Sequence, residues 1–191
     1  MNKEAIIDIA QSGLLAPSAD NRHVFRYELT MDSINLWPSP EFAATDKGHH
    51  LVLGLISLGA VVENMRLRAS MLGFATDLQW QSRHEDHHGM IARLTFRPST
   101  PNVDGLASAI PDRHTNRSMY RGPALSDKEL SSLTGEIDSI QGVQIKWLQG
   151  DARKRALALI WRAESERFLR RSLHQEIFTS IRFDLSWQQS A

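Results

Sequence analysis

Apolar residues recur at helical spacing in three long segments of the chain. The pattern predicts a first helix from about Lys3 to Leu15, a long helix from His49 to Leu72, and a basic helix from Asp151 to about Arg171. The long helix is apolar almost all round, so we expect it to be buried on more than one side. Its second contact is either the core of its own subunit or an interface with another subunit or domain.

Shorter segments in which apolar and polar residues alternate predict strands. Phe25–Thr30 and Ile34–Trp37 pair most simply as a hairpin, and Thr76–Gln81 and Met90–Arg97 follow the long helix. A fifth strand is predicted over Val143–Leu148.

Breaker residues divide the chain near its middle. The stretch from Pro98 to Gly105 is rich in Pro, Ser, Asn and Gly, which predicts a linker between a unit at 1–100 and a second at 106–191. A segment without periodicity, Glu41–Lys47, is predicted to be a connecting loop. Shorter helices are predicted over Leu106–Ile110, after the capping box Ser126-Asp127-Lys128-Glu129, and over His174–Ile181.

Composition narrows the classes of function. Lys+Arg and Asp+Glu are equal at 22 each, so no overall charge points to nucleic acid. The chain has no cysteine, which removes disulfides and thiolate chemistry. The apolar run Leu51–Val62 holds only about a dozen residues, too few to span a bilayer. The N-terminus does not resemble a secretion signal, so we expect a cytoplasmic protein.

A cluster of histidines and carboxylates lies at 83–88, between two predicted strands. Imidazole and carboxylate groups suit a divalent metal. Strongly polar residues are equally typical of a solvated hairpin loop, and a surface loop is the favoured interpretation. No metal site is predicted.

Two polar segments carry the candidate chemistry. The first, Ala16-Pro17-Ser18-Ala19-Asp20-Asn21-Arg22-His23, lies between the first helix and the first strand. Pro17 stops the helix, because a proline disfavours the helical conformation of the residue before it. Short polar residues such as Ser18 and Asn21 satisfy the backbone of a turn or reach a ligand. From the residues alone, this segment can be interpreted either as a connecting loop or as a ligand-binding loop.

The second segment is Pro111-Asp112-Arg113-His114-Thr115-Asn116-Arg117-Ser118-Met119-Tyr120. The guanidinium forks of Arg113 and Arg117 match the oxygens of a phosphate group bidentately. Thr115 adds a hydroxyl group, and His114 adds a donor that depends on its charge. For Arg117, a solvated surface charge is the alternative.

Together the two segments resemble the flavin motifs of the nitroreductase-like FMN-binding family. The first resembles the family's A-P-S-x-x-N loop, which lies close to the flavin ring. The second resembles the R-R-[ST]-x-R-x-[FY] segment, which holds the flavin phosphate. The order, with the loop before the arginine segment, is similar to that of a tandem subgroup, Acg-type or fused to E1-type activating domains. In such chains a first, truncated copy is followed by a second that begins at the arginine segment. By this resemblance, the second copy here is expected to be incomplete, since its own A-P-S-x-x-N loop and later strands are missing.

This chain departs from the family pattern in two places. The residues after Asn21 do not continue with the glutamine, proline and tryptophan of simple nitroreductases, which changes one wall of the pocket. Arg113 and His114 stand where the family has two arginines, which leaves one permanent charge fewer.

The resemblance implies a nitroreductase-like α+β fold, with an antiparallel or mixed sheet flanked by helices and a long buried central helix. It also implies an FMN-dependent oxidoreductase in which NAD(P)H reduces FMN, and FMN passes electrons to a nitro-aromatic, a quinone or a similar acceptor. No residue need act as nucleophile or general base. The cofactor-binding residues it implies are Ser18, Asn21, Arg113, His114, Thr115 and Arg117. Two alternatives are a protein that sequesters FMN without turnover and a degenerate interaction module that binds no flavin.

Flavin sites in this family draw on two units. We therefore expect a homodimer, or a missing second unit, to complete the site. The expected contact is the face of the long helix around Leu55, Leu58 and Val62. The apolar residues Phe183, Leu185 and Trp187 near the end of the chain also favour a second unit, because without one they would form an exposed apolar patch.

Overall fold

The structure is a computed structural model that describes residues 1–191 except 22, 46–47, 82–88, 103, 117, 120–121, 139 and 180–191. The chain forms two compact units, Met1–Arg117 and Ser118–Ala191. The division comes later than the predicted linker at 98–105. The reason is that the short helix α4 (Gly105–Ala109) packs on the long helix α3 (His49–Met71) of the first unit.

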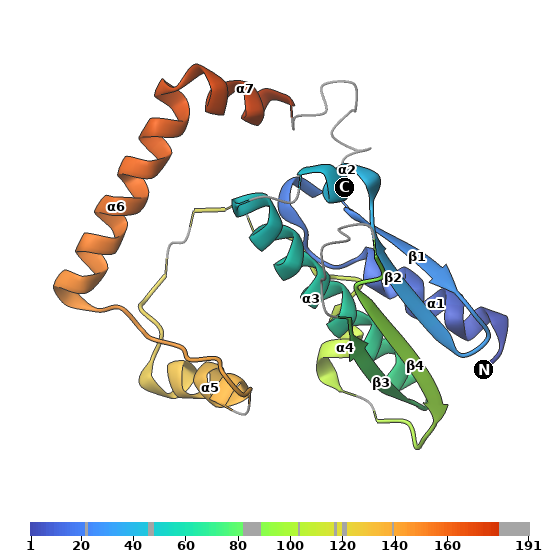
Figure 1. Cartoon of the computed structure of the whole chain (residues 1–191). Coiled ribbons are helices and arrows are strands. Elements are labelled where there is room, and N and C mark those ends of the chain that lie inside the picture. Colours follow the sequence, from blue (N-terminus) through green and yellow to red (C-terminus); the bar gives the residue numbers. More distant parts are fainter. Residues whose placement is uncertain are drawn as a thin grey trace. The chain divides into compact units, whose positions relative to one another are not determined.

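The first unit contains a four-stranded antiparallel sheet (Figure 1). Its strands, in the order β1-β2-β4-β3, are β1 (Phe25–Leu29), β2 (Ser33–Pro38), β4 (Ala92–Pro98) and β3 (Phe74–Trp80). The predicted hairpin is confirmed, since Phe25 lies opposite Pro38 and Leu29 opposite Ile34. The predicted α+β class with an antiparallel sheet is likewise confirmed.

Helix α1 (Lys3–Leu14) and helix α3 cover one face of this sheet, and the core lies between the two layers. Side chains from both helices and from the two central strands are fully buried there: Ile9, Ile34, Leu36, Leu58, Met65 and Leu94. Alternation along the strands turns their apolar residues to this face and their polar residues to the other. In β2 the polar residues Ser33 and Asn35 are buried as well, so burial there does not follow the alternation.

Polar contacts fix how α1 lies against α3. The guanidinium of Arg68 donates to both carboxylate oxygens of Asp8, at 2.6 to 3.1 Å. One turn further along, the Asn64 side-chain amide donates to the Ser12 carbonyl at 3.0 Å. Gly13 lets the helices approach closely, because a Cβ atom there would lie 2.5 Å from Cε of Met65. The loop that follows α1 is thus held beside α3.

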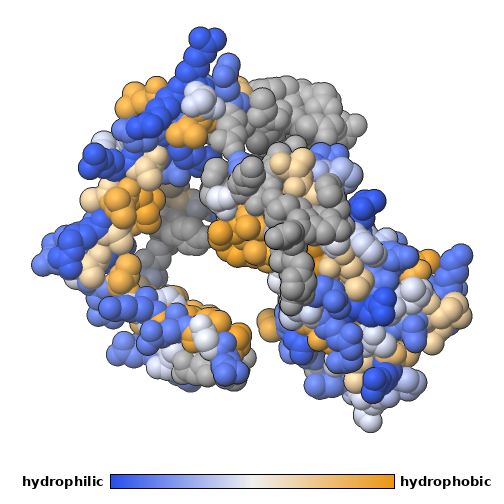
Figure 2. All heavy atoms as spheres, viewed as in Figure 1, coloured by the Kyte–Doolittle hydropathy of each residue, from blue (hydrophilic) through white to orange (hydrophobic). Residues whose placement is uncertain are grey.

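Helix α3 is buried on one side only within the first unit, which corrects the predicted all-round burial. Leu58 and Val62 are 1% and 4% exposed and belong to the core of the unit. Leu55 is 42% exposed and Ile56 is 65% exposed. The expected contact face around Leu55, Leu58 and Val62 therefore mixes core and surface residues. The exposed apolar side chains near the start of α3 are Val52, Leu53, Leu55 and Ile56, where Figure 2 shows orange side chains gathered.

By length and composition, one helix among the described residues could cross a membrane, the stretch His50–Met71. This apolar stretch is longer than the dozen residues read from the sequence. Its buried residues, such as Val61, Met65 and Ala69, lie in the core between α1 and the sheet. On another side of the helix Glu63 and Arg66 form an ion pair at 2.7 Å. A core helix of a globular unit has these same properties.

The predicted loop at Glu41–Lys47 is wrong, because α2 (Pro40–Thr45) forms there. Ser39 Oγ accepts a hydrogen bond from the backbone N–H of Phe42 at 3.1 Å, as the side chain of an N-cap residue does. Pro40 then occupies the first helical position, where its missing N–H costs nothing. Phe42 packs edge-on against Phe25, with ring centroids 5.4 Å apart. Six residues are too few for periodicity to reveal such a helix.

The second unit contains the helices α5 (Asp127–Asp138), α6 (Gly150–Leu169) and α7 (Arg171–Thr179). The predicted capping box is confirmed. The Ser126 N–H donates to Glu129 Oε2 at 2.7 Å, and the Glu129 N–H donates to Ser126 Oγ at 3.3 Å. The interaction with Ser126 also holds the pKa of the Glu129 carboxyl below its usual value. The predicted basic helix is α6, and α7 begins earlier than predicted.

The predicted strand at Val143–Leu148 is wrong. These residues form no strand in the part of the chain that the structure describes, and a strand requires a partner for its backbone groups. Instead the Trp147 indole N–H donates to Thr134 Oγ1 at 2.9 Å, which ties this segment to α5. The apolar residues Phe183, Leu185 and Trp187 lie outside the described residues.

Candidate functional site

The candidate site begins where α1 ends. Leu15 follows the last residue of α1, and its N–H still bonds to the Ser12 carbonyl. The chain then forms a short 3-10 turn, Ala19–Asn21, closed by a hydrogen bond from the Asn21 N–H to the Ser18 carbonyl at 3.3 Å. Asn21 has a φ angle of 54°. Asparagine is one of the few residues that adopt this left-handed conformation readily, so the turn chemistry predicted for this loop is present.

Ser18 presents a buried hydroxyl group. Its Oγ atom has no hydrogen-bond partner among the described residues. Buried polar atoms are almost always hydrogen-bonded, and an exception of this kind points to a ligand or an ordered water. Asn21, in contrast, is exposed. The loop therefore offers one enclosed hydroxyl group and one accessible amide.

The arginine segment meets this loop within the first unit. Arg113 Nε donates to the carbonyl oxygen of Leu15 at 3.3 Å, a contact between residues 98 positions apart in the sequence. This bond uses one of the guanidinium N–H groups, and the fork can form further hydrogen bonds. The two segments that carry the family resemblance are thus neighbours in space.

The other predicted ligands of the second segment contribute less to the described geometry. His114 Nδ1 lies 3.0 Å from the carbonyl oxygen of Asp112, a contact within the segment itself. His114 and Thr115 are both exposed, and no contact from either to the Ser18 loop is observed. Arg117 lies outside the described residues. The structure therefore brings Arg113 to Leu15, directly before the first segment, and leaves His114 and Thr115 exposed.

These residues form an open surface. Two shallow depressions among the described residues lie elsewhere, one on the sheet and one beside α5, and neither is lined by Ser18, Asn21 or Arg113. A flavin-sized ligand normally has most of its surface buried. Neither depression coincides with the candidate residues.

A second polar cluster, which the sequence analysis missed, lies on the face of the sheet that the helices do not cover. Glu28 Oε2 accepts hydrogen bonds from Asn35 Nδ2 at 3.0 Å and from Trp37 Nε1 at 3.1 Å. These bonds hold the pKa of the Glu28 carboxyl below its usual value. Arg93 Nε donates to Asn35 Oδ1 at 2.8 Å and extends the cluster to β4. The observed register of the hairpin sets Glu28 opposite Asn35, and no register is predicted from the sequence.

The cluster lines one side of a shallow depression formed by Arg26, Tyr27, Glu28 and Trp37. Burial raises the pKa of the Tyr27 hydroxyl to about 12, and that hydroxyl has no hydrogen-bond partner among the described residues. Every polar side chain of the Glu28 cluster is bonded to another member. Such a closed network is typical of a structural role, pinning strand to strand.

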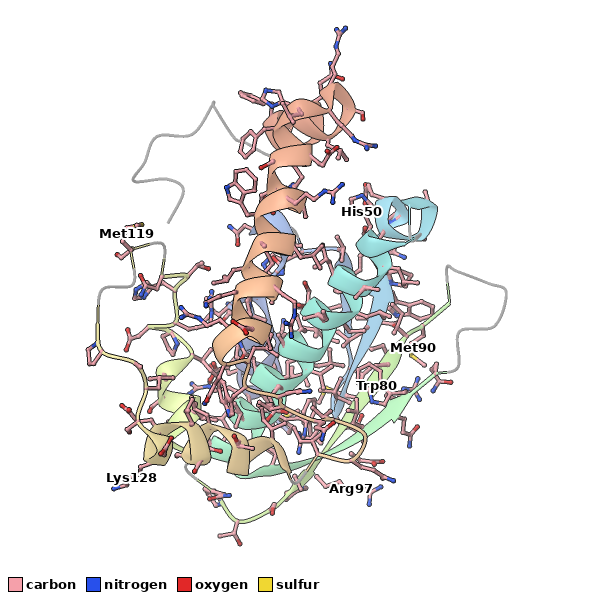
Figure 3. All side chains as sticks on the ribbon, turned by 90° about the vertical axis from the view of Figure 1, so that its left-hand side faces the viewer. His50, Trp80, Met90, Arg97, Met119 and Lys128 are labelled. Atoms are coloured by element: carbon pink, nitrogen blue, oxygen red, sulfur yellow. The ribbon has the colours of Figure 1, made fainter. Side chains whose placement is uncertain are left out.

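Metal chemistry finds no support in the described residues, where no group of three or more potential ligands occurs. The histidine and carboxylate cluster at 83–88 lies outside them. Figure 3 shows Trp80 and Met90, which flank that segment, at the same end of the β3–β4 pair. The prediction of a surface loop there is not tested.

Comparison with known proteins gives distant structural similarities. No protein-family model matches the chain. No curated protein matches it either. Among solved structures, the chain is similar to an NADPH:FMN oxidoreductase from Vibrio harveyi complexed with NAD+. The TM-score is 0.43 at 13% identity, over 73% of this chain and 77% of the other.

It is also similar to nitroreductase A from Vibrio parahaemolyticus. There the TM-score is 0.41 at 14% identity, over 82% of this chain and 83% of the other. Similarities at this distance do not assign the chain to a family. The assignment of a function therefore depends on the residues of the candidate site.

Proposed function

We propose that this chain is an FMN-dependent oxidoreductase of the nitroreductase type, which transfers electrons from NAD(P)H to a nitro-aromatic, a quinone or a similar acceptor. The observation that carries the proposal is the hydrogen bond from Arg113 to the Leu15 carbonyl. It links the arginine segment to Leu15, the residue directly before the Ala16–His23 segment, although nearly half the chain separates the two segments in sequence. The arrangement supports a single site to which both segments contribute.

The residues present fit the polar parts of FMN. The buried Ser18 hydroxyl lacks a partner in the described structure, and it can donate to or accept from the flavin ring. The exposed amide of Asn21 can do both at once. Arg113 supplies a guanidinium fork for the phosphate, with Thr115 and His114 as additional donors on the same segment. Arg117 belongs to the proposed set on sequence grounds.

Bound FMN would supply the hydride chemistry, and the protein's part is to hold the ring, orient it and exclude water. None of the six residues is assigned as a nucleophile or a general base. The proposed roles of Ser18 and Asn21 are hydrogen bonds to the ring, and the proposed role of Arg113 is to bind the phosphate. FMN is preferred to FAD in this proposal, because the chain has no Gly-rich fingerprint for a second nucleotide.

The open surface of the site implies a second unit. Four of the six proposed ligands, Asn21, Arg113, His114 and Thr115, are exposed in the first unit. We therefore propose that a homodimer, or a second unit from another chain, closes the site. Its contact surface includes the exposed part of α3 at Val52, Leu53 and Ile56, in place of the core residues Leu58 and Val62. Sedimentation of a monomer that holds FMN stoichiometrically would contradict this.

The experiment that tests the function uses purified protein and Arg113→Ala. We expect a yellow protein, or quenching of FMN fluorescence on titration, and oxidation of NADPH or NADH when an acceptor is present. Arg113→Ala should weaken FMN binding by about 1.5–3 kcal/mol, the range for a charge-assisted hydrogen bond. Riboflavin, which lacks the phosphate, should lose far less affinity.

Arg97→Ala is the matched control, because Arg97 is an exposed arginine on β4 that takes no part in the proposed site. Equal losses for FMN and riboflavin would show that Arg113 makes no phosphate contact. Protein that binds FMN but does not oxidise either nicotinamide would favour the sequestering alternative. A colourless protein that quenches no FMN fluorescence would refute the flavin proposal. The remaining alternative would then be an interaction module that binds no flavin.

A further inference from the structure

The last turn of α1 is held by a side chain from another helix. Asn64, on α3, donates from Nδ2 to the carbonyl oxygen of Ser12 at 3.0 Å. In return, the Ser12 hydroxyl shares its proton between the carbonyl oxygens of Ile9 at 2.7 Å and Asn64 at 3.2 Å. Ser12 is 6% exposed, so the pair lies at the buried junction of the two helices.

The bond from Asn64 satisfies a group that a helix leaves open. The last four carbonyl groups of an α-helix have no partner within the helix. Helix α1 ends at Leu14, so the Ser12 carbonyl is one of these four. The same carbonyl accepts the N–H of Leu15 at 3.2 Å, and a carbonyl oxygen can accept two bonds. Asn64 therefore caps the C-terminal end of α1 from outside the helix.

The capped turn leads directly to the candidate site. The N–H of Ala16 bonds to the Gly13 carbonyl at 3.1 Å. The carbonyl oxygen of the same peptide unit is that of Leu15, and it accepts Arg113 Nε at 3.3 Å. A peptide unit is planar, so the direction of its N–H fixes the direction of its carbonyl. The end of α1 thus orients the acceptor of Arg113, three residues before Ser18 and its buried hydroxyl.

We propose that Asn64 is a positioning residue of the candidate site, which acts through the last turn of α1 on the Leu15 carbonyl and Arg113. Among the described residues, its side chain bonds to Ser12 and to none of the proposed FMN ligands. The effect of Asn64 on ligand binding rests on the proposed function. Its effect on the Arg113 side chain can be measured without any ligand.

A second polar contact between the same two helices provides the comparison. Asp8 and Arg68 form an ion pair at 2.6 Å, one turn before Ser12 on α1. This pair also holds α1 against α3, but it involves no carbonyl group of the last turn. Asp8→Ala therefore loosens the same pair of helices and leaves the Ser12 carbonyl capped. If Asn64 only held the helices together, Asp8→Ala and Asn64→Leu would have the same effect on Arg113.

The test measures the Arg113 side chain of the ligand-free full chain by NMR. Its Nε–H signal is identified by its loss in Arg113→Ala, and its exchange with solvent reports how often the bond to Leu15 opens. Asn64→Leu replaces the amide by an apolar group of similar size and removes the donor. We expect exchange at least about threefold faster in Asn64→Leu and within about twofold of the wild type in Asp8→Ala. Asn64→Ala, which favours the helix, serves where circular dichroism shows that Asn64→Leu does not fold.

Titration of FMN fluorescence with the same variants measures the effect on the site. Asn64→Leu should weaken FMN binding at least about threefold, and Asp8→Ala less than about twofold. The double variant Asn64→Leu/Arg113→Ala should lose less affinity than the product of the two single losses, because the two residues act through one contact.

An Arg113 exchange rate equal to that of the wild type in a folded Asn64 variant would overturn the proposal. Equal acceleration in Asp8→Ala would overturn it too, since Asn64 would then serve only to pack the helices. Where the wild type binds FMN, an unchanged affinity of the Asn64 variant would likewise overturn it. A wild type that binds no FMN would refute the proposed function, and the exchange rates would still decide whether Asn64 positions Arg113.

Discussion

Leu58 and Ile56 lie two residues apart on α3 and differ sharply in environment. Leu58 is 1% exposed and belongs to the core of the first unit, whereas Ile56 is 65% exposed. The sequence predicts that Leu58 belongs to a subunit interface, and on that prediction Leu58→Glu would dissociate a dimer. The structure predicts instead that Leu58→Glu unfolds the first unit and that Ile56→Glu does not.

The magnitude follows from burial. Loss of a fully buried leucine side chain costs about 2–5 kcal/mol, as in Leu→Ala substitutions. An unpaired carboxylate in the same place costs several kcal/mol more, even when it shifts its pKa to become neutral. Together these reach about 5 kcal/mol or more, a large part of the 5–15 kcal/mol that stabilises a typical domain. Ile56→Glu replaces a side chain that is exposed within one copy and should change the free energy of unfolding of the monomer by about 0.5 kcal/mol or less. It also places a charge in the proposed dimer contact, so it should dissociate the dimer.

Circular dichroism during thermal and urea denaturation distinguishes the two variants. We expect Leu58→Glu to lose its cooperative transition, or to melt far below the wild type. We expect Ile56→Glu to keep a cooperative transition and to sediment as a monomer. Sedimentation is measured on the same samples to separate unfolding from dissociation. A folded Leu58→Glu protein with a wild-type melting temperature would refute the assignment of Leu58 to the core.

Two further predictions concern the same unit. Gly54→Ala should destabilise the protein by about 1–3 kcal/mol through overpacking, because its Cβ would lie 2.3 Å from Cε2 of the buried Phe42 ring. Gly59→Ala, the control in the same helix, meets no atom within 4 Å and should stabilise by about 0.5–1 kcal/mol in thermal denaturation. Burial raises the pKa of Tyr27 to about 12, so between pH 10 and 12 the folded protein holds the phenolic proton more tightly than the unfolded chain does. The wild type therefore keeps its full stability below pH 10 and loses stability as the pH rises toward 12. Tyr27→Phe should therefore match the wild type below pH 10, since the hydroxyl lacks a partner in the described structure, and exceed it above; equal losses in urea denaturation from pH 10 to 12 would refute this.

The elements of the first unit could be predicted because local pattern and tertiary burial agree there. The β1–β2 hairpin and α3 follow directly from alternation and helical spacing. Helix α2 could not be found by periodicity, although Ser39 and Pro40 are a recognisable helix start. The strand predicted at Val143–Leu148 failed for the opposite reason, since strand propensity without a neighbouring strand leaves backbone groups unpaired.

The same contrast holds for the candidate site. Turn chemistry at Pro17 and Asn21 is local, so the sequence predicts the loop correctly. That Arg113 reaches the Leu15 carbonyl depends on the path of the intervening chain, which no local pattern determines. Which side of α3 is buried is likewise a property of how α1 packs, fixed by contacts such as Asp8 with Arg68.

The contact between Arg113 and Leu15 also has a consequence for the folding of the first unit. It closes a loop of nearly a hundred residues, whereas the hairpin and the helices close short ones. Contacts of large sequence separation form late, because the entropy of loop closure must be overcome before they contribute. The arginine segment should thus join the Ser18 loop only after the sheet and both helices have assembled. A ligand held by both segments would stabilise only the fully assembled unit and would therefore raise the barrier to its unfolding.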